Sequence, residues 1–121
     1  MSNYQDASEH AHQVTLMQWF DKRHKKYAGR LIAIPNGGHR AKSVAVKLKA
    51  EGVKKGVPDM FLPVASNGYY GLFIELKKIK GRATSEQKEW INNLNEAGYL
   101  AVICEGWESA SVVILDYLNN G

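Results

Sequence analysis

Two acidic residues and a lysine around a short apolar hairpin are the part of this sequence best suited to chemistry. Glu75 and Lys77 lie two residues apart, so on a strand, where side chains alternate between faces, both point to one face. Asp59 follows Gly56-Val57-Pro58, in which glycine allows a close turn and proline fixes φ. A bare Glu-x-Lys is usually a surface ion pair. The pair therefore gains meaning only if the fold brings Asp59 beside it.

The hairpin loop decides whether the two acids meet. A two-residue Asn67-Gly68 turn would place Asp59 opposite Leu76, on the wrong face from Glu75. A three-residue loop, Ser66-Asn67-Gly68, would place Asp59 opposite Glu75, with the glycine in the left-handed position that such a loop requires. We therefore expect the three-residue loop. Two adjacent carboxylates repel each other unless a hard divalent cation lies between them, so this register predicts a metal site.

Composition favours one domain with a polyanionic partner. The chain has 121 residues, 45% of them hydrophobic and 23% charged, which suits a single packed core. All 16 Lys and Arg lie within residues 1–90, whereas residues 91–121 contain four of the 12 acids and no base. The basic surface is therefore regional, and with a pI of about 9.2 it indicates a phosphate-bearing partner such as nucleic acid.

Other sites and locations are less favoured. The one cysteine, Cys104, excludes an internal disulfide and a cysteine-rich zinc site, and its apolar surroundings predict a core position. His10 and His12 point to different sides of a helix and cannot chelate a metal together. No apolar run is long enough to span a membrane, and the polar N-terminus is unlike a signal peptide. We expect a cytoplasmic protein with no membrane partner.

The elements that must position the acids are predicted in the order α-β-α-β-β-α-β-α. Asp6 or Ser8 can cap the first helix, and Thr84 with Gln87 forms a capping-box pattern for the third. The apolar run 99–104 is typical of a strand covered on both faces. The predicted helices are 8–26, 40–50, 84–97 and 110–118, and the predicted strands are 30–35, 60–64, 69–79 and 99–104.

These motifs, in this order and spacing, resemble the PD-(D/E)xK nuclease superfamily. Gly56-Val57-Pro58-Asp59, then Glu75-Leu76-Lys77, then Gln87 in a following helix are similar, more narrowly, to the small stand-alone VRR-NUC domains of bacteria and their viruses. Glu9 and Gln13, four residues apart, match the acid and amide of the first helix in that family. The resemblance covers nearly the whole chain. It implies one domain over the full length, an α/β restriction-endonuclease-like fold with a central mixed sheet flanked by helices.

The resemblance also implies an activity, that of a Mg²⁺- or Mn²⁺-dependent deoxyribonuclease without an organic cofactor. Lys77 would orient or activate the attacking water and stabilise charge on the phosphate, and Gln87 would support the site. Together with these two, Glu9, Asp59 and Glu75 complete the implied catalytic set. The implied metal ligands are three carboxylates and one main-chain carbonyl: Glu9, Asp59, Glu75 and the carbonyl of Leu76.

The expected substrate is DNA, cut according to its structure more than its sequence. The resemblance implies branched substrates, such as four-way junctions or flaps, and a homodimer whose two sites are related by a two-fold axis. The apolar run 112–118 exceeds what one helix face buries, so it is either a dimer interface or part of the core. The alternative function is a non-catalytic nucleic-acid-binding or assembly protein with the same fold. Seven basic residues flank the acids in sequence and are the expected phosphate contacts: Arg40, Lys42, Lys54, Lys55, Lys78, Lys80 and Arg82.

Overall fold

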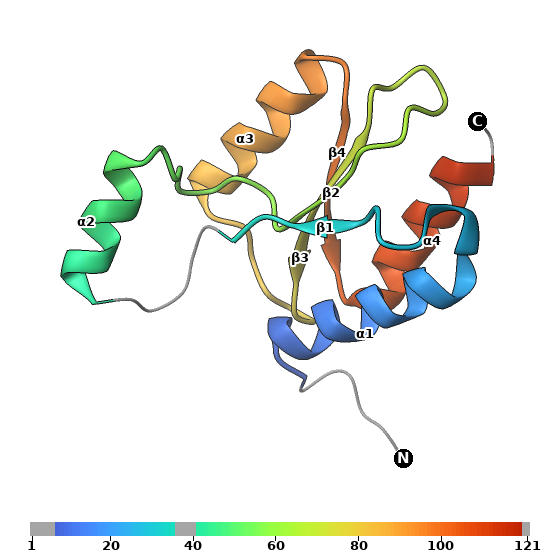
Figure 1. Cartoon of the computed structure of the whole chain (residues 1–121), viewed down its shortest axis with the longest axis horizontal. Coiled ribbons are helices and arrows are strands. Elements are labelled where there is room, and N and C mark those ends of the chain that lie inside the picture. Colours follow the sequence, from blue (N-terminus) through green and yellow to red (C-terminus); the bar gives the residue numbers. More distant parts are fainter. Residues whose placement is uncertain (1–6, 36–40, 120–121) are drawn as a thin grey trace.

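The predicted order of elements is confirmed by a computed structural model, which describes residues 7–35 and 41–119. A short 3-10 helix, η2, is the one element of this part that the sequence did not predict (Figure 1). The elements are α1 (Glu9–Arg23), η2 (Lys25–Tyr27), β1 (Ile32–Ala33), α2 (Lys42–Ala50), β2 (Met60–Leu62), β3 (Leu72–Lys77), α3 (Ser85–Glu96), β4 (Leu100–Glu105) and α4 (Trp107–Asn119). No helix in these two ranges is both long and apolar enough to cross a membrane.

The strands form one mixed sheet, as predicted, and their order in it is β1-β2-β3-β4. β2 is antiparallel to both of its neighbours, β1 and β3, whereas β3 and β4 are parallel. Parallel neighbours need a long crossover, and α3 provides it. The helices α1 and α4 pack together on one side of the sheet, and α3 packs against β4 on the other (Figure 1). β3 is consequently an inner strand, with α1 and α4 packed against it.

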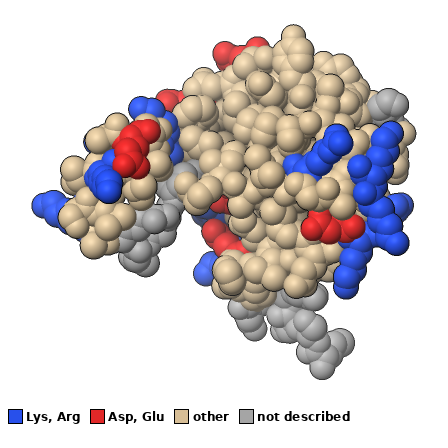
Figure 2. Space-filling model, viewed as in Figure 1, with Lys and Arg blue, Asp and Glu red and all other residues tan. Residues whose placement is uncertain are grey.

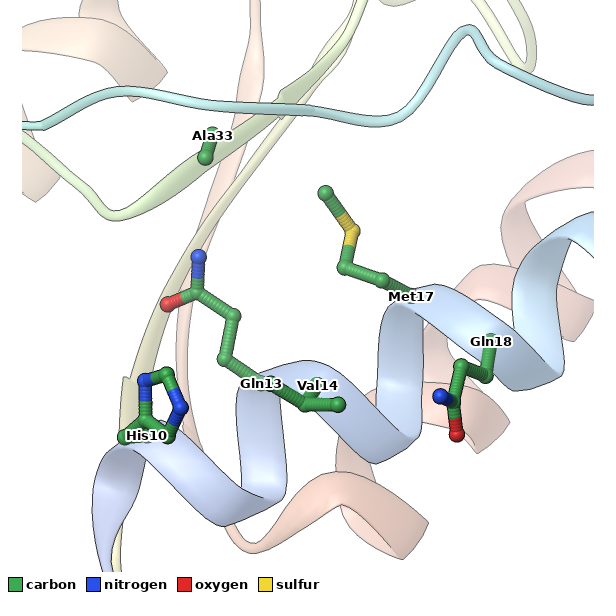
Figure 3. Close-up of a pocket in the computed structure, with 6 residues that line it drawn as sticks. All are labelled: His10, Gln13, Val14, Met17, Gln18 and Ala33. Atoms are coloured by element: carbon green, nitrogen blue, oxygen red, sulfur yellow. The ribbon is translucent and has the colours of Figure 1, made fainter.

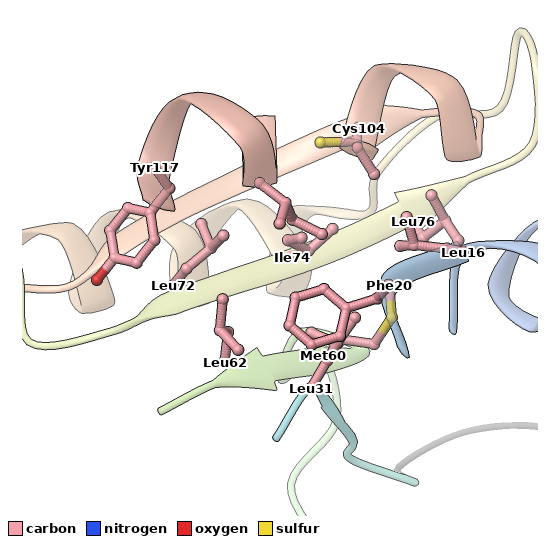
Figure 4. Close-up of a cluster of buried hydrophobic side chains, with 12 residues drawn as sticks. Leu16, Phe20, Leu31, Met60, Leu62, Leu72, Ile74, Leu76, Cys104 and Tyr117 are labelled. Atoms are coloured by element: carbon pink, nitrogen blue, oxygen red, sulfur yellow. The ribbon is translucent and has the colours of Figure 1, made fainter. Parts of the chain in front are cut away.

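The core lies between the sheet and the pair α1 and α4. Leu72, Ile74 and Leu76 point from one face of β3 into this cluster, where Phe20 of α1 and Tyr117 of α4 meet them (Figure 4). All five side chains are almost completely buried, and full burial of such a side chain stabilises a fold by about 1.5–3 kcal/mol. Because side chains alternate along the strand, the residues between these three face the opposite side. The core thus anchors β3 and leaves its second face for the polar residues of the site.

The register of the hairpin is the predicted one, but the loop that produces it is different. Met60 pairs with Ile74, so Asp59 comes opposite Glu75 as expected. The tip is a two-residue turn, Asn67-Gly68, with both residues at positive φ, and not the expected three-residue loop. Between the tip and the β2–β3 ladder one chain has three residues, 63–65, and the other has two, 70–71. This extra residue shifts the pairing by one, which a turn-based prediction cannot include.

The apolar run in the last helix packs into the core, so the predicted surplus at 112–118 is wrong. Ile114 and Tyr117 are buried, and Val113 and Leu118 pack against the same cluster. Only Val112 among the described large apolar residues of this run is strongly exposed, at 57%. The helix absorbs the run because it touches both the sheet and α1. This segment therefore gives no independent support for a dimer interface.

The strand at 99–104 was predicted to be covered on both faces, and this is also wrong in part. β4 lies at the edge of the sheet, and Ile103 is 40% exposed. Cys104 is buried in the core, as predicted, and burial raises the pKa of its thiol to about 11. The cysteine is therefore a packing residue held in the unreactive thiol form.

Candidate active site

Glu75 and Lys77 are two buried charges on the face of β3 that is turned away from the core. They are 1% and 7% exposed, and Lys77 Nζ lies 3.4 Å from Glu75 Oε2. Ionic side chains are almost never buried without a partner, because contacts with apolar neighbours do not offset the free energy lost when the charge leaves water. The surface ion pair that a bare Glu-x-Lys suggests is therefore not what this strand contains. A buried acid and a buried lysine form the centre of the site.

Asp59 joins this centre from just before β2, and it is held by main-chain groups of β3 and of the residue after β1. The Leu76 N–H donates to Asp59 Oδ2 at 2.8 Å, and the N–H of Ile34 donates to the Asp59 carbonyl oxygen at 2.7 Å. The preceding turn needs glycine at position 56, where φ is +92° and an added Cβ would come within 2.8 Å of Glu86. These contacts fix the carboxylate in place and leave Oδ1 as its candidate ligand atom.

Gln87 couples the site to the start of α3. Gln87 Oε1 accepts from the main-chain N–H of Thr84 at 2.8 Å, and the main-chain N–H of Gln87 donates to Thr84 Oγ1 at 3.2 Å. The predicted capping box is therefore present. The side-chain amide is thereby oriented with Nε2 outward, and Nε2 donates to Glu75 Oε2 at 3.2 Å. One side chain both caps the helix and holds the acid, which is a stronger reason for glutamine here than either role alone.

Glu9 reaches the site from the first turn of α1. Its Oε2 lies 3.9 Å from Lys77 Nζ, and its side chain is 47% exposed, so this contact is weaker than the buried one. Ser8, one of the two predicted caps, accepts from the Ala11 N–H at 3.0 Å and begins the helix just before Glu9. Lys77 therefore bridges the buried Glu75 and the more accessible Glu9.

His12 is the site-forming residue that the sequence analysis missed. It is 1% exposed, and its Nδ1 accepts from the Trp107 N–H at 3.1 Å, which ties α1 to the first turn of α4. The signal was available: His12, Leu16 and Phe20 recur every four residues and are the buried residues of α1. By fixing the angle of α1, His12 helps to set where Glu9 lies.

The electrostatics of the site centre on Glu75. Burial raises the pKa of its carboxyl to about 8, with the Asp59 charge adding to the rise and the Lys77 ammonium acting against it. Glu75 Oε1 is buried and has no hydrogen-bond partner among the described residues. A buried carboxyl oxygen without a donor, close to a second carboxylate, is unfavourable unless something positive compensates it.

This arrangement fits a hard divalent cation. The donors on offer are carboxylate and main-chain oxygens, the ligands that Mg²⁺ and Mn²⁺ prefer. Within residues 7–35 and 41–119, no three His, Cys, Asp or Glu side chains come together as a metal-binding group. Asp59 and Glu75 are thus the central pair, and an ion held there would draw its remaining ligands from a main-chain carbonyl, water or phosphate.

The expected phosphate contacts are at exposed positions, except Arg40, which is outside the described residues. Lys55 lies 3.8 Å from Glu86 of α3, and the Lys80 N–H donates to Glu105 at 2.6 Å. α2 buries no side chain and projects from the rest of the protein (Figure 1). The surface is hollowed between α2 and the rest of the protein, with acidic side chains on the wall of the hollow (Figure 2). The exposed lysines of this group are Lys42, Lys54, Lys55, Lys78 and Lys80, with Arg82 exposed beside them.

Comparison with known proteins agrees with this geometry. The family model of the VRR-NUC domain matches residues 7–108. A solved structure described as a VRR_NUC domain protein is similar to the chain with a TM-score of 0.85 and 31% sequence identity. That similarity covers 100% of this chain and 93% of the other. No curated protein matches the chain.

Proposed function

Because this chain belongs to the VRR-NUC domain family and has a nuclease-type fold, we propose that it is a metal-dependent endonuclease that hydrolyses phosphodiester bonds in DNA. The observation that carries the proposal is the buried contact set on β3. Glu75 Oε2 lies 3.4 Å from Lys77 Nζ and 3.2 Å from Gln87 Nε2. Asp59 Oδ2 accepts from the main-chain N–H of Leu76, the residue between Glu75 and Lys77. Such a set is costly for folding, so its presence favours a catalytic role over a purely structural one.

Each residue has a role that follows from its position. Asp59 and Glu75 would hold Mg²⁺ or Mn²⁺, with the Leu76 carbonyl as a further oxygen donor, whereas Glu9 contacts Lys77 and does not join the two acids in a three-carboxylate group of the described residues. When bound, the ion would supply positive charge at the phosphate and lower the pKa of a bound water. Lys77 would stabilise the negative charge that the phosphate gains in the transition state, and it would orient the attacking water. Gln87 holds the Glu75 carboxylate by Oε2 and leaves Oε1 for the cation.

A cleavage assay on three DNAs with matched sequences tests this function: a duplex, a flap and a four-way junction, each with Mg²⁺ and with EDTA. We expect cleavage only with the metal and faster on the two branched forms. Tight binding without cleavage in Mg²⁺ or Mn²⁺ would favour the alternative, a non-catalytic nucleic-acid-binding protein.

Two separate basic surfaces support a branched substrate. One consists of exposed lysines of α2 and the loop after it, among them Lys42, Lys54 and Lys55, and the other lies along the end of α1 and through η2, where Lys22, Arg23, Lys25, Lys26 and Arg30 are exposed. Lys26 and Arg30 both lie over the ring of Tyr27, at 5.3 and 5.8 Å from its centre. A straight duplex in the hollow would use only the first surface. A second arm of a junction or flap is a fitting partner for the other.

Removing Lys54 and Lys55 together is expected to reduce the salt dependence of DNA binding. If both contact phosphates, the slope of log affinity against log salt should fall by about 0.9 for each, because fewer counterions are released. Fluorescence anisotropy between low and moderate salt measures the slope. Lys88→Ala, at an exposed position of α3 outside the expected contacts, is the control. An unchanged slope in the double alanine variant would make this loop an ordinary solvated one.

The homodimer remains part of the proposal, now with a different basis. Val46 of α2 is 62% exposed, an apolar side chain on a helix that has no buried residue. Light scattering at micromolar concentration should give a mass near twice the 13.5 kDa of the chain. Val46→Glu should return it to one chain mass. A concentration-independent 13.5 kDa species in the unmodified protein would reject the dimer.

A further inference from the structure

A pocket beside the active site has no role in the chemistry described so far. It has a volume of about 390 Å³ and lies between α1 and β1, lined by His10, Gln13, Val14, Met17, Gln18 and Ala33 (Figure 3). Gln13 and Met17 extend from the helix toward the strand, where Ala33 forms part of the opposite wall (Figure 3). The volume lies within the roughly 300–1,000 Å³ that small-ligand sites have.

Both walls of the pocket continue directly into the active site. On α1, Glu9 precedes Gln13 by four residues, about 6 Å along a helix axis, or roughly two stacked base steps. On the other wall, Ala33 pairs with Met60, the neighbour of Asp59. The next residue, Ile34, donates to the Asp59 carbonyl oxygen at 2.7 Å. A group in the pocket would therefore lie one or two nucleotides from a phosphate held at Asp59 and Glu75.

The lining chemistry suits a nucleobase better than a phosphate. None of the six residues is Asp, Glu, Lys or Arg, so the pocket offers no fixed countercharge to an anion. Met17, Val14 and Ala33 provide apolar surface for the faces of a base. The amides of Gln13 and Gln18 each offer donors and an acceptor for its edge, and an imidazole such as His10 can stack on it.

We propose that this pocket binds an unpaired base of the DNA substrate, beside the phosphate that is cut. The inference rests on the proposed nuclease function and adds a reason for its structure selectivity. A paired base must first leave the stack, at a cost of a few kcal/mol, whereas a base at a flap or junction is already free or easily freed. Branched DNA is thus favoured by what the pocket accepts as well as by the basic surfaces.

The test is DNA binding in EDTA, so that it does not depend on hydrolysis. A labelled flap DNA is compared with the same flap carrying abasic sites at the two nucleotides flanking the branch. The unmodified protein should bind the flap with bases roughly tenfold more tightly, as expected for one stacked base. Ala33→Leu fills the pocket and should reduce this ratio to near one, with binding of a paired duplex unchanged. Ala65→Leu, a matched change at an exposed position of the hairpin, should keep the ratio.

A second variant protects the test against misfolding of the first. Gln18→Leu, at an exposed helical position, removes an edge contact and should lower the ratio by several-fold. Equal binding of the two flaps by the unmodified protein, or a full ratio in both pocket variants, overturns the proposal. If the ratio is present and lost in the variants but no DNA is cut in Mg²⁺, the base pocket stands and the nuclease function fails.

Discussion

Glu75→Gln is expected to abolish DNA cleavage while leaving DNA binding intact. The change removes the buried carboxylate that has Oε1 free of hydrogen bonds among the described residues, but none of the basic surface. Substitution of a residue that only supports a metal ligand typically lowers activity by about 10- to 100-fold. Removal of a ligand itself should cost more, so we expect the cleavage rate to fall by more than about 100-fold. Single-turnover cleavage in Mg²⁺ and anisotropy in EDTA measure the two properties.

The control for this substitution is Glu89→Gln, which makes the same chemical change at an exposed position of α3. It should cleave at the normal rate. Normal cleavage by Glu75→Gln itself would remove Glu75 from the metal site, and with it the central pair of the proposal.

The same variant should also change how stability depends on pH. The pKa of Glu75 is raised to about 8 in the folded protein, so between its ordinary value of 4.5 and about 8 the folded state binds a proton that the unfolded chain has released. Stability of the metal-free protein therefore decreases as pH rises through this range. Glu75→Gln has no such group, and its melting temperature relative to the unmodified protein should increase from pH 5 to pH 8. A difference in melting temperature between the two proteins that stays constant from pH 5 to pH 8 would contradict the raised pKa.

Lys77→Met is expected to slow turnover by about 100- to 1,000-fold, the usual cost of removing one group that stabilises a transition-state oxyanion. The substitution keeps the length of the side chain and removes its charge, while Asp59 and Glu75 remain to hold the ion. Single-turnover rates together with Mn²⁺ titration by calorimetry separate the two effects. We expect a low rate with metal still bound.

Lys77→Arg tests whether charge alone is sufficient. The lysine side chain is 9% exposed and contacts carboxylates at 3.4 and 3.9 Å, so a larger, always protonated guanidinium has little room and should not restore the rate. Loss of metal binding in Lys77→Met, with the rate per bound metal unchanged, would instead give the lysine a structural role.

Local sequence was enough to predict most of the site. Glu75 and Lys77 share a face because of strand alternation, and the capping box at Thr84 and Gln87 is a short-range pattern. The facing of Asp59 and Glu75 was also predicted, although for a partly wrong reason. The register at the hairpin tip differs by one residue from the register of the β2–β3 ladder. The extra residue between the tip and the ladder depends on packing, which the sequence rules for turns do not describe.

Features that depend on distant contacts could not be predicted in the same way. The sequence around His12 does not reveal that its Nδ1 accepts from the main-chain N–H of Trp107, 95 residues later. The apolar run of α4 looked excessive because the sequence does not reveal that this helix touches both the sheet and α1. Burial of a helix on more than one side is a tertiary property, and hydrophobic periodicity alone underestimates it.

The way in which α2 is inserted has a consequence for how such a protein can change over generations. α2 lies between β1 and β2 and buries no side chain, so substitutions along it cost little folding stability. The entropic cost of closing a loop also rises only slowly with loop length, so insertions there reduce folding stability only slightly. The sheet and Asp59 can thus stay constant while mutation and recombination alter the length and charge of this arm. If α2 contacts DNA as proposed, its exchange between relatives would change DNA preference without any change to the proposed active site.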